Sequence, residues 1–258
     1  MKSPKILVLR AAGTNCDVET AEALKAVGGA PDLVPVASLK TGKVKLMDYA
    51  MLVIPGGFSY GDDVGAGKIL ANQIRLYLKD LRQFIRLGRP VLGICNGFQA
   101  LVKAGILPTS NLCEQTAGFT INDSGRFEAR WVHLRLNTQS SSLFFKGLPE
   151  MIELPVAHGE GKLVIKAPRH LEELKKNKSI AMQYVSDDGK LTGYPANPNG
   201  SLFNIAALSN PEGNCLGMMP HPERYTTRYQ HPNWTRQTFV KDGVGLALFK
   251  NAVDYCKS

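Results

Sequence analysis

Residues 91–101 constrain the fold most, because they combine a strand, an abrupt turn and the start of a helix around one cysteine. The apolar run at residues 91–94 predicts a buried parallel strand, and apolar residues recur at helical spacing after the cysteine. Cys95 therefore lies at the break between strand and helix. The sequence Gly-Ile-Cys-Asn-Gly at residues 93–97 has the Gly-x-nucleophile-x-Gly form of an elbow, with cysteine in place of serine.

An elbow would give the Cys95 thiol the surroundings that acyl transfer needs. Free backbone N–H groups and the positive end of the following helix favour the thiolate and can hold a developing oxyanion. The alternative is a small buried cysteine in an ordinary strand-to-helix turn, because a five-residue pattern arises easily by chance.

Strands alternate with helices through the first hundred residues. Short apolar runs predict strands at residues 5–9, 33–36 and 50–54, and helical spacing predicts helices from about 17 to 27 and 69 to 87. This alternation is typical of an α/β protein with a doubly wound, mostly parallel sheet, which binds ligands at the carboxyl ends of its strands. Cys95 and the glycines after residue 54 fall on that edge.

The second half of the chain has a different pattern, with short segments in which apolar and polar residues alternate. Alternating segments at residues 118–121 and 127–136 predict a small antiparallel extension of the sheet. Two further strands, at 202–208 and 215–219, are joined by a turn-forming sequence that predicts a hairpin. At this length we expect one domain that spans residues 1–258.

Composition indicates a cytoplasmic protein. Hydrophobic residues make up 44% of the chain, and no apolar run is long enough to span a bilayer or to form a signal sequence. Five cysteines without CxxC spacing argue against a disulfide framework and a zinc site, so we expect free thiols and no bound metal. The cysteines are at positions 16, 95, 113, 215 and 256.

The net charge of +9 does not by itself indicate a nucleic-acid partner. The densest basic run, residues 162–178, is interleaved with Glu172 and Glu173 and reads as a solvated face. The alternative is electrostatic steering of an anionic substrate or docking to an acidic partner. We expect neither nucleic acid nor membrane as a partner.

Residues 55–68 contain five glycines but do not form a phosphate-binding loop. Gly61 and Gly67 enclose five residues where four are required, and Ile69 stands where Ser or Thr should bind magnesium. The Gly56–Gly57 turn instead suits a second backbone N–H for an oxyanion hole, with a plain strand-to-loop turn as the alternative.

A histidine and a glutamate near the end of the chain could serve Cys95. Pro220 and Pro222 predict an extended segment, in which His221 and Glu223 point the same way. His221 could then remove the thiol proton while Glu223 orients the imidazole. We expect structural roles for the other candidates, His158 in a glycine-rich loop and Cys16 at a helix start.

These residues resemble the class I glutamine amidotransferases, whose triad of Cys, His and Glu lies on a flavodoxin-like sheet. Within that class the chain is similar to the glutaminase subunits of the phosphoribosylformylglycinamidine synthases. This similarity is carried by four segments, at residues 13–17, 56–63, 157–161 and 217–224. Two regions, 165–191 and 225–242, are less familiar and could alter partner docking or be neutral surface insertions.

The resemblance implies site residues. Cys95 would be the nucleophile, His221 the base and Glu223 its orienter, and the oxyanion hole would be formed by the backbone N–H groups of Gly57 and Asn96. Bound glutamine would lie at Gln99, His158, Gly159 and Glu160.

The resemblance also implies a reaction and partners. Glutamine would be hydrolysed to glutamate through a thioester, and the ammonia would pass to a synthetase large subunit that works with a small accessory subunit. That partner would bind ATP and Mg²⁺ and convert formylglycinamide ribonucleotide to its amidine, so we expect no cofactor in this chain.

Two other functions remain open from the sequence. One is a different elbow-cysteine hydrolase, such as a peptidase or deglycase, although Gln99 and the late His-Pro-Glu speak against it. The other is a non-catalytic subunit that keeps the fold and only binds a partner.

Overall fold

The computed structural model describes residues 3–108, 114–236 and 242–258. Cys113, one of the predicted free thiols, and residues 237–241 lie outside this part of the chain. The strands are β1 (Lys5–Arg10), β2 (Ala30–Pro35), β3 (Met51–Ile54), β4 (Val91–Ile94), β5 (Ala117–Thr120), β6 (Glu128–Leu136), β7 (Met151–His158), β8 (Lys162–Ile165), β9 (Ile180–Val185), β10 (Ile205–Ser209) and β11 (Cys215–Met218). The helices are α1 (Asp17–Ala26), α2 (Val36–Lys40), α3 (Lys68–Arg75), α4 (Leu78–Arg86), α5 (Asn96–Lys103), α6 (Pro168–Lys176) and α7 (Val244–Tyr255).

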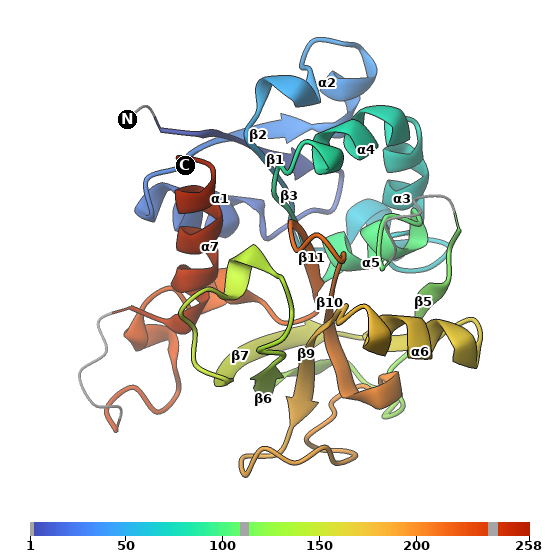
Figure 1. Cartoon of the computed structure of the whole chain (residues 1–258), viewed down its shortest axis with the longest axis vertical. Coiled ribbons are helices and arrows are strands. Elements are labelled where there is room, and N and C mark those ends of the chain that lie inside the picture. Colours follow the sequence, from blue (N-terminus) through green and yellow to red (C-terminus); the bar gives the residue numbers. More distant parts are fainter. Residues whose placement is uncertain (1–2, 109–113, 237–241) are drawn as a thin grey trace.

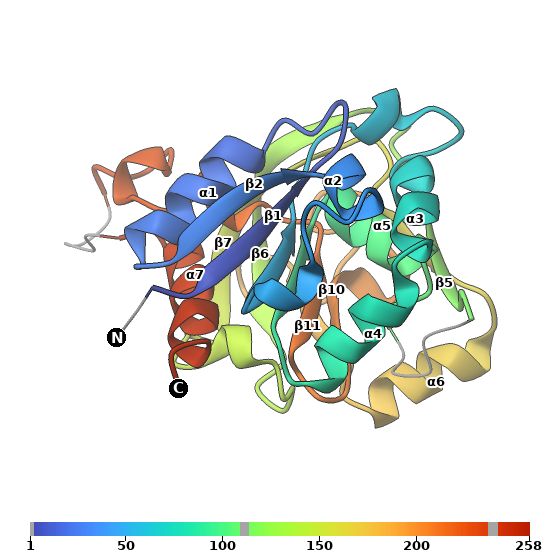
Figure 2. The ribbon, with the colours of Figure 1, turned by 90° about the horizontal axis from the view of Figure 1, so that it is seen from above.

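A nine-stranded sheet runs through the molecule in the order β2-β1-β3-β4-β11-β10-β9-β6-β7 (Figure 1). The first five strands are parallel to one another. Every residue of β3 and β4 is buried, as in a sheet covered on both faces. Helices α1 and α7 cover one face of this parallel part, and α3, α4 and α5 cover the other (Figure 2). The predicted α/β class and the doubly wound parallel core are confirmed.

The remaining strands of the large sheet are antiparallel to their neighbours. The predicted hairpin joins β10 to β11. In β6 and β7, buried residues largely alternate with partly buried ones, as in strands with one face toward the core. A separate antiparallel pair is formed by β5 and β8. The predicted antiparallel extension is therefore present, and most of it continues the main sheet.

The antiparallel part curls back over the carboxyl edge of the parallel part. In a flat sheet β7 would lie about 24 Å from β4, five strand spacings away. The Ala157 carbonyl in β7 nevertheless lies 3.7 Å from the Cys95 Sγ atom just after β4. Strand twist accumulated across the sheet produces such a curl, and it brings the end of β7 to the elbow.

Three details of the sequence prediction were wrong. The helix expected over residues 69–87 is two helices, because α3 packs on α5 whereas α4 turns away toward residues 46–48. The strand expected at 202–208 begins with a 3₁₀ turn, Leu202–Asn204, before β10. The region 165–191 is not a surface insertion throughout, because it contains β9 in the interior of the sheet.

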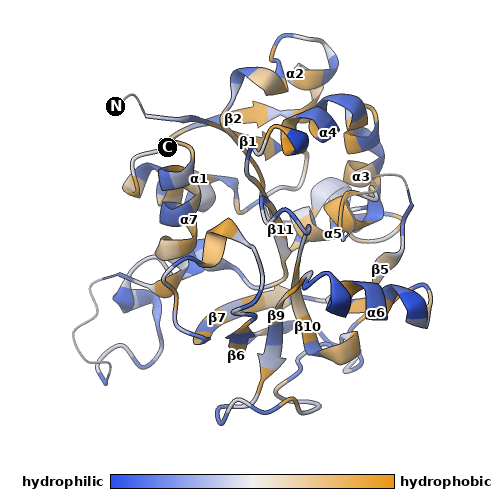
Figure 3. Ribbon diagram, viewed as in Figure 1, coloured by the Kyte–Doolittle hydropathy of each residue, from blue (hydrophilic) through white to orange (hydrophobic). Residues whose placement is uncertain are grey.

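The basic run at 162–178 is a solvated face, as predicted. It forms β8 and α6, and most of its lysines are exposed, with Lys166 and Lys175 paired to nearby glutamates. Figure 3 shows the hydrophilic outer side of α6 in contrast to the apolar central strands. Within the described ranges, no helix is both long enough and apolar enough to cross a membrane.

Candidate active site

Three neighbouring parallel strands bring the predicted triad and the Gly56–Gly57 turn to one edge of the sheet. Gly56 and Gly57 follow β3, Cys95 follows β4, and His221 follows β11. Because β3, β4 and β11 are adjacent and parallel, their carboxyl ends lie side by side. Residues far apart in sequence meet here for that reason, at the edge where such sheets bind ligands.

Cys95 has the backbone of a strained elbow. Its φ of 48° and ψ of −104° lie outside the helical and extended regions that L residues prefer. The Cys95 N–H donates to the Met218 carbonyl at 2.7 Å, which fixes the elbow against β11. A Cβ at Gly97 would lie 1.9 Å from the Ile54 carbonyl oxygen, so only glycine lets α5 start this close to β3.

His221 and Glu223 form a buried pair. Both side chains are 2% exposed or less, and the distance between His221 Nδ1 and Glu223 Oε1 is 2.6 Å. The predicted extended conformation was wrong, because Pro222–Arg224 is a 3₁₀ turn. Proline fits the first position of a helical turn, where no N–H is needed, and the turn itself brings the carboxylate onto the imidazole.

Electrostatics favour a protonated imidazole. Burial alone would lower the pKa of His221, but the Glu223 carboxylate and the Cys95 thiolate raise the pKa well above its usual value. His221 Nε2 has no hydrogen-bond partner among the described residues. This nitrogen is therefore available to exchange a proton with Cys95 and with a substrate.

The triad is tightly packed around Gly56. A Cβ there would lie 2.8 Å from His221 Cε1, 3.3 Å from Cys16 Sγ and 3.4 Å from Cys95 Cβ. The lack of a side chain at residue 56 is what allows the imidazole of His221, the Cys16 thiol and Cys95 Cβ to pack around one point.

Sequence reasoning missed the part that Cys16 and Arg224 play beside the triad. The Cys16 Sγ atom lies 4.0 Å from His221 Nδ1 and accepts a hydrogen bond of 3.2 Å from Arg224 Nη2. Arg224 in turn pairs with Glu19 on α1 at 3.1 Å. Burial raises the pKa of Cys16 and so disfavours its thiolate form. In the sequence, the one feature that pointed to Arg224 is its position directly after His-Pro-Glu.

Cys16, His221 and Glu223 are also the one group in the described ranges whose ligand atoms are close enough for a metal ion, within 4.8 Å of one another. Their atoms are already engaged by the bond between His221 and Glu223 and by the Arg224 guanidinium. A cation already lies beside the thiol, which disfavours a second one. The expectation of no bound metal stays a prediction.

The backbone N–H groups of Gly57 and Asn96, predicted to form the oxyanion hole, belong to the residues that follow β3 and the Cys95 elbow. Asn96 is the first residue of α5, so its N–H precedes the first intrahelical bond, which runs from Gln99 to the Cys95 carbonyl. Gly57 has a φ of 139° and forms an isolated antiparallel bridge with Thr14. The hydrogen bonds beside this bridge are made by the residues next to Gly57, the Gly56 carbonyl and the Phe58 N–H. The N–H of Gly57 itself is not used in that pairing.

Gln99, predicted at the glutamine site, has its side-chain amide bound within the protein. Its Nε2 donates to the Glu160 carbonyl at 2.5 Å, and its Oε1 accepts from Asn96 Nδ2 at 3.1 Å. Gln99 therefore links the start of α5 to the loop at residues 158–161.

Glu160 extends this link to the glycine-rich segment. Its Oε2 accepts from the Ala66 N–H at 3.1 Å and lies 3.9 Å from Lys103 Nζ. Asp62, in the same segment, accepts from Asn96 Nδ2 at 2.9 Å. Three loops that follow three different strands are thereby held together around Cys95.

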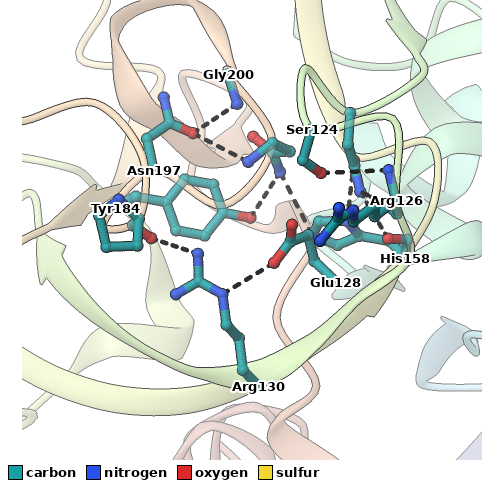
Figure 4. Close-up of polar contacts among 11 residues, drawn as sticks. Ser124, Arg126, Glu128, Arg130, His158, Tyr184, Asn197 and Gly200 are labelled. Atoms are coloured by element: carbon teal, nitrogen blue, oxygen red, sulfur yellow. Dashed lines mark hydrogen bonds and ion pairs between the residues drawn. The ribbon is translucent and has the colours of Figure 1, made fainter.

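His158 and Gly159 lie in the loop but differ in exposure. His158 is 3% exposed and its ring is buried among polar side chains, shown in Figure 4 together with Tyr184, Glu128 and Arg130. Burial lowers the pKa of His158 to about 4, so the ring is neutral and poorly suited to act as a base. Gly159 is half-buried, and its carbonyl accepts from the Asn122 N–H.

Comparison with known proteins gives the same family along the whole chain. The family model of the CobB/CobQ-like glutamine amidotransferase domain matches residues 3–256. The phosphoribosylformylglycinamidine synthase subunit PurQ of Dehalococcoides mccartyi is 42% identical over 259 residues, which cover 100% of this chain and 99% of that protein. The subunit of the same name from Pyrococcus furiosus is 40% identical over 257 residues, or 98% of this chain and 99% of the relative.

Solved structures agree. A chain in the structure of PurLQS from Thermotoga maritima has a TM-score of 0.74 and 28% identity and covers 98% of this chain and 99% of its own length. A putative GMP synthase subunit from Thermoplasma acidophilum, with a TM-score of 0.59 and 15% identity over 100% of this chain and 96% of its own, supports the fold alone. The chain therefore belongs to the class I glutamine amidotransferases, in the family of the phosphoribosylformylglycinamidine synthase subunit PurQ.

Proposed function

We propose that this chain hydrolyses glutamine to glutamate and supplies the ammonia to a phosphoribosylformylglycinamidine synthase. The observation that carries the proposal is the arrangement of Cys95 on a strained elbow beside a buried, hydrogen-bonded pair of His221 and Glu223. The full-length similarity to PurQ subunits supports the choice of pathway. We further propose that residues 1–258 act as a single domain.

The proposed chemistry begins at the Cys95 sulfur. His221 Nε2 takes the thiol proton, and the thiolate attacks the side-chain carbonyl carbon of glutamine. The N–H groups of Gly57 and Asn96 stabilise the oxyanion that forms. When the carbon–nitrogen bond breaks, His221 gives its proton to the departing ammonia and a thioester to Cys95 remains. Water, deprotonated by His221, then releases glutamate and restores the thiol.

Glu223 acts through His221 in this scheme. The carboxylate holds the imidazole by Nδ1, so that Nε2 faces the reaction, and it stabilises the imidazolium that forms twice in each cycle. Glutamine would lie against Gln99 and the loop formed by His158, Gly159 and Glu160. The backbone of this loop lies beside the Cys95 sulfur, as the 3.7 Å distance to the Ala157 carbonyl indicates.

The proposed partners are the synthetase large subunit and a small accessory subunit. The composite name of the Thermotoga maritima protein, PurLQS, joins a Q component to an L and an S component, and a chain in that structure matches ours over nearly its whole length. In this proposal ATP and Mg²⁺ bind to the large subunit, which consumes the ammonia. We place the complex in the cytoplasm, where the Cys95 thiol stays reduced.

The test is release of glutamate from glutamine by the purified chain, with and without the synthetase subunits, ATP and formylglycinamide ribonucleotide. Cys95→Ala should abolish release under every condition. Cys256→Ala, which removes a half-buried thiol at the end of α7, is the matched control and should leave release unchanged. We expect the partners to raise release sharply, because a partner that binds the ordered form of the site better shifts the chain toward that form.

The same assay separates the alternatives. Equal inactivity of wild type and Cys95→Ala in the full complex would mean a non-catalytic subunit. Turnover of a peptide or a glycated substrate without turnover of glutamine would mean another elbow-cysteine hydrolase.

A further inference from the structure

Buried polar side chains surround His158 at the end of β7 (Figure 4), and the amides of Asn122 and Asn199 contact its ring. Asn122 precedes β6, His158 ends β7, and Asn199 lies in the turn before β10. Asn122 is 2% exposed, His158 is 3% exposed and Asn199 is fully buried. Polar groups buried this deeply must satisfy one another, so their hydrogen bonds can be assigned one by one.

The assignment begins at Asn122. Its Nδ2 donates to the carbonyls of Arg126 at 2.9 Å and His158 at 2.8 Å, which fixes the orientation of the amide. Asn122 Oδ1 must then be an acceptor, and it lies 2.8 Å from the Gly161 N–H and 3.2 Å from His158 Nδ1. His158 Nδ1 therefore carries a hydrogen.

The hydrogen-bond role of the other ring nitrogen, His158 Nε2, follows from Asn199. Asn199 Oδ1 accepts from the Ser201 N–H at 3.0 Å and from the Ser201 hydroxyl at 2.7 Å, so its Nδ2 is the donor. That Nδ2 lies 3.4 Å from His158 Nε2 and 3.3 Å from the Tyr184 hydroxyl. His158 Nε2 must accept, because a hydrogen there would face another donor. The ring is therefore the neutral tautomer with its proton on Nδ1.

The same contacts hold the loop at both ends. Asn122 binds the His158 carbonyl, the Gly159 carbonyl and the Gly161 N–H. A Cβ at Gly161 would lie 2.5 Å from His158 Nδ1 and 2.7 Å from Asn199 Nδ2, so the loop closes directly over the ring. The loop then offers the Glu160 carbonyl to Gln99, on the side of the active site.

We propose that Asn122, neutral His158 and Asn199 form a clamp that positions the glutamine loop, and that the His158 side chain, whose two ring nitrogens are already bound within the protein, does not touch glutamine. The inference rests on the proposed function, because glutamine is placed at this loop by that proposal. His158 and its two partners are thus positioning residues, and they act on substrate binding rather than on the triad. Their loss should raise KM for glutamine more than it lowers kcat.

The kinetic test compares three variants in the assembled complex. His158→Ala loses both ring contacts, and we expect KM for glutamine to rise at least about tenfold, since displacements near 1 Å at a site cost that much or more. His158→Asn keeps a donor toward Asn122 and should recover part of the loss, while kcat stays within about threefold of wild type in both. Gly193→Ala, at an exposed position with open space around it, is the control.

The main readout of a second measurement comes from the wild-type chain and needs no variant. Nitrogen-15 NMR of the histidine-labelled chain should show His158 neutral at pH 7 with its hydrogen on Nδ1. Asn199→Asp, which sets a carboxylate against Nε2, should raise the pKa of His158 from its value of about 4. A hydrogen on Nε2, or an imidazolium at pH 7 in the wild type, would overturn the clamp.

The two proposals fail in different ways. If His158→Ala folds and binds glutamine with an unchanged KM, the clamp is wrong while the glutaminase function stands. If wild type does not turn over glutamine, or Cys95→Ala does, the proposed function is wrong and the NMR result still decides the state of His158.

Discussion

At the scale of single residues, the charge state of the site depends on the buried pair of His221 and Glu223. Both side chains are buried, and the carboxylate has one oxygen on the imidazole while the other has no hydrogen-bond partner among the described residues. A buried carboxylate that is engaged so one-sidedly is costly unless its neighbour carries a positive charge. The pair is therefore arranged to keep a proton on His221 at neutral pH.

Glu223→Gln tests this arrangement. The amide oxygen can still accept from Nδ1, but the negative charge is lost, so the pKa of His221 should fall from its raised value. Because His221 must hold a proton to release ammonia, the alkaline limb of the kcat/KM profile should move to lower pH. We expect kcat/KM at neutral pH to fall by about 10² to 10⁴-fold.

The control for this variant is Glu153→Gln, at a second contact between glutamate and histidine, where Glu153 Oε2 lies 3.2 Å from His231 Nε2. Its pH profile should match wild type. An unchanged alkaline limb in Glu223→Gln would show that the carboxylate does not set the protonation of His221.

At the scale of elements, the parallel core and the close approach of Cys95, His221 and Glu223 were predictable, whereas the supporting contacts were not. Short apolar runs identify β3 and β4 because both faces of these strands are buried, and adjacent parallel strands then place Cys95 beside the Gly56 turn. The break between α3 and α4 depends on which neighbour each half packs against, and no local pattern records that choice.

The contacts around His158 escaped prediction for a similar reason. Asn122 and Asn199 come from loops 77 residues apart, and isolated asparagines in turns have no periodicity that points to a partner. The curl of the sheet that returns β7 to the elbow is likewise a property of accumulated twist. Sequence patterns indicate which residues are reactive, and tertiary packing decides what holds them.

The elbow between β4 and α5 leads to a prediction about stability. Gly97→Ala should force α5 away from β3, because the added methyl would overlap the Ile54 carbonyl. We expect the free energy of unfolding to fall by about 1–3 kcal/mol, as in other overpacked cores, and glutaminase activity to fall with it as Cys95 moves. Urea unfolding measures the first effect. Gly118→Ala, whose methyl would make only ordinary contacts beyond 3.4 Å, should change neither quantity.

At the scale of the whole molecule, the clamp ties stability to pH, because His158 lies where the antiparallel half of the sheet meets the active site. Burial lowers the pKa of His158 to about 4 in the folded chain, below the value of about 6.5 in the unfolded chain. Between these values the unfolded state binds more protons than the folded state. The free energy of unfolding therefore does not depend on this group well above pH 6.5, and it decreases as the pH falls from 6.5 toward 4, because the unfolded chain binds the proton more readily.

The expected size follows from the two pKa values. Lowering the pH from 7 to 5 should remove about 2 kcal/mol of the wild-type free energy of unfolding through this one group. His158→Asn has no titrating ring, so the stability difference between wild type and variant should shrink by that amount between the two pH values. Urea unfolding at both pH values measures it, and other acid-sensitive groups cancel in the comparison. A difference that stays constant with pH would mean that His158 accepts a proton as readily in the folded chain as in the unfolded one.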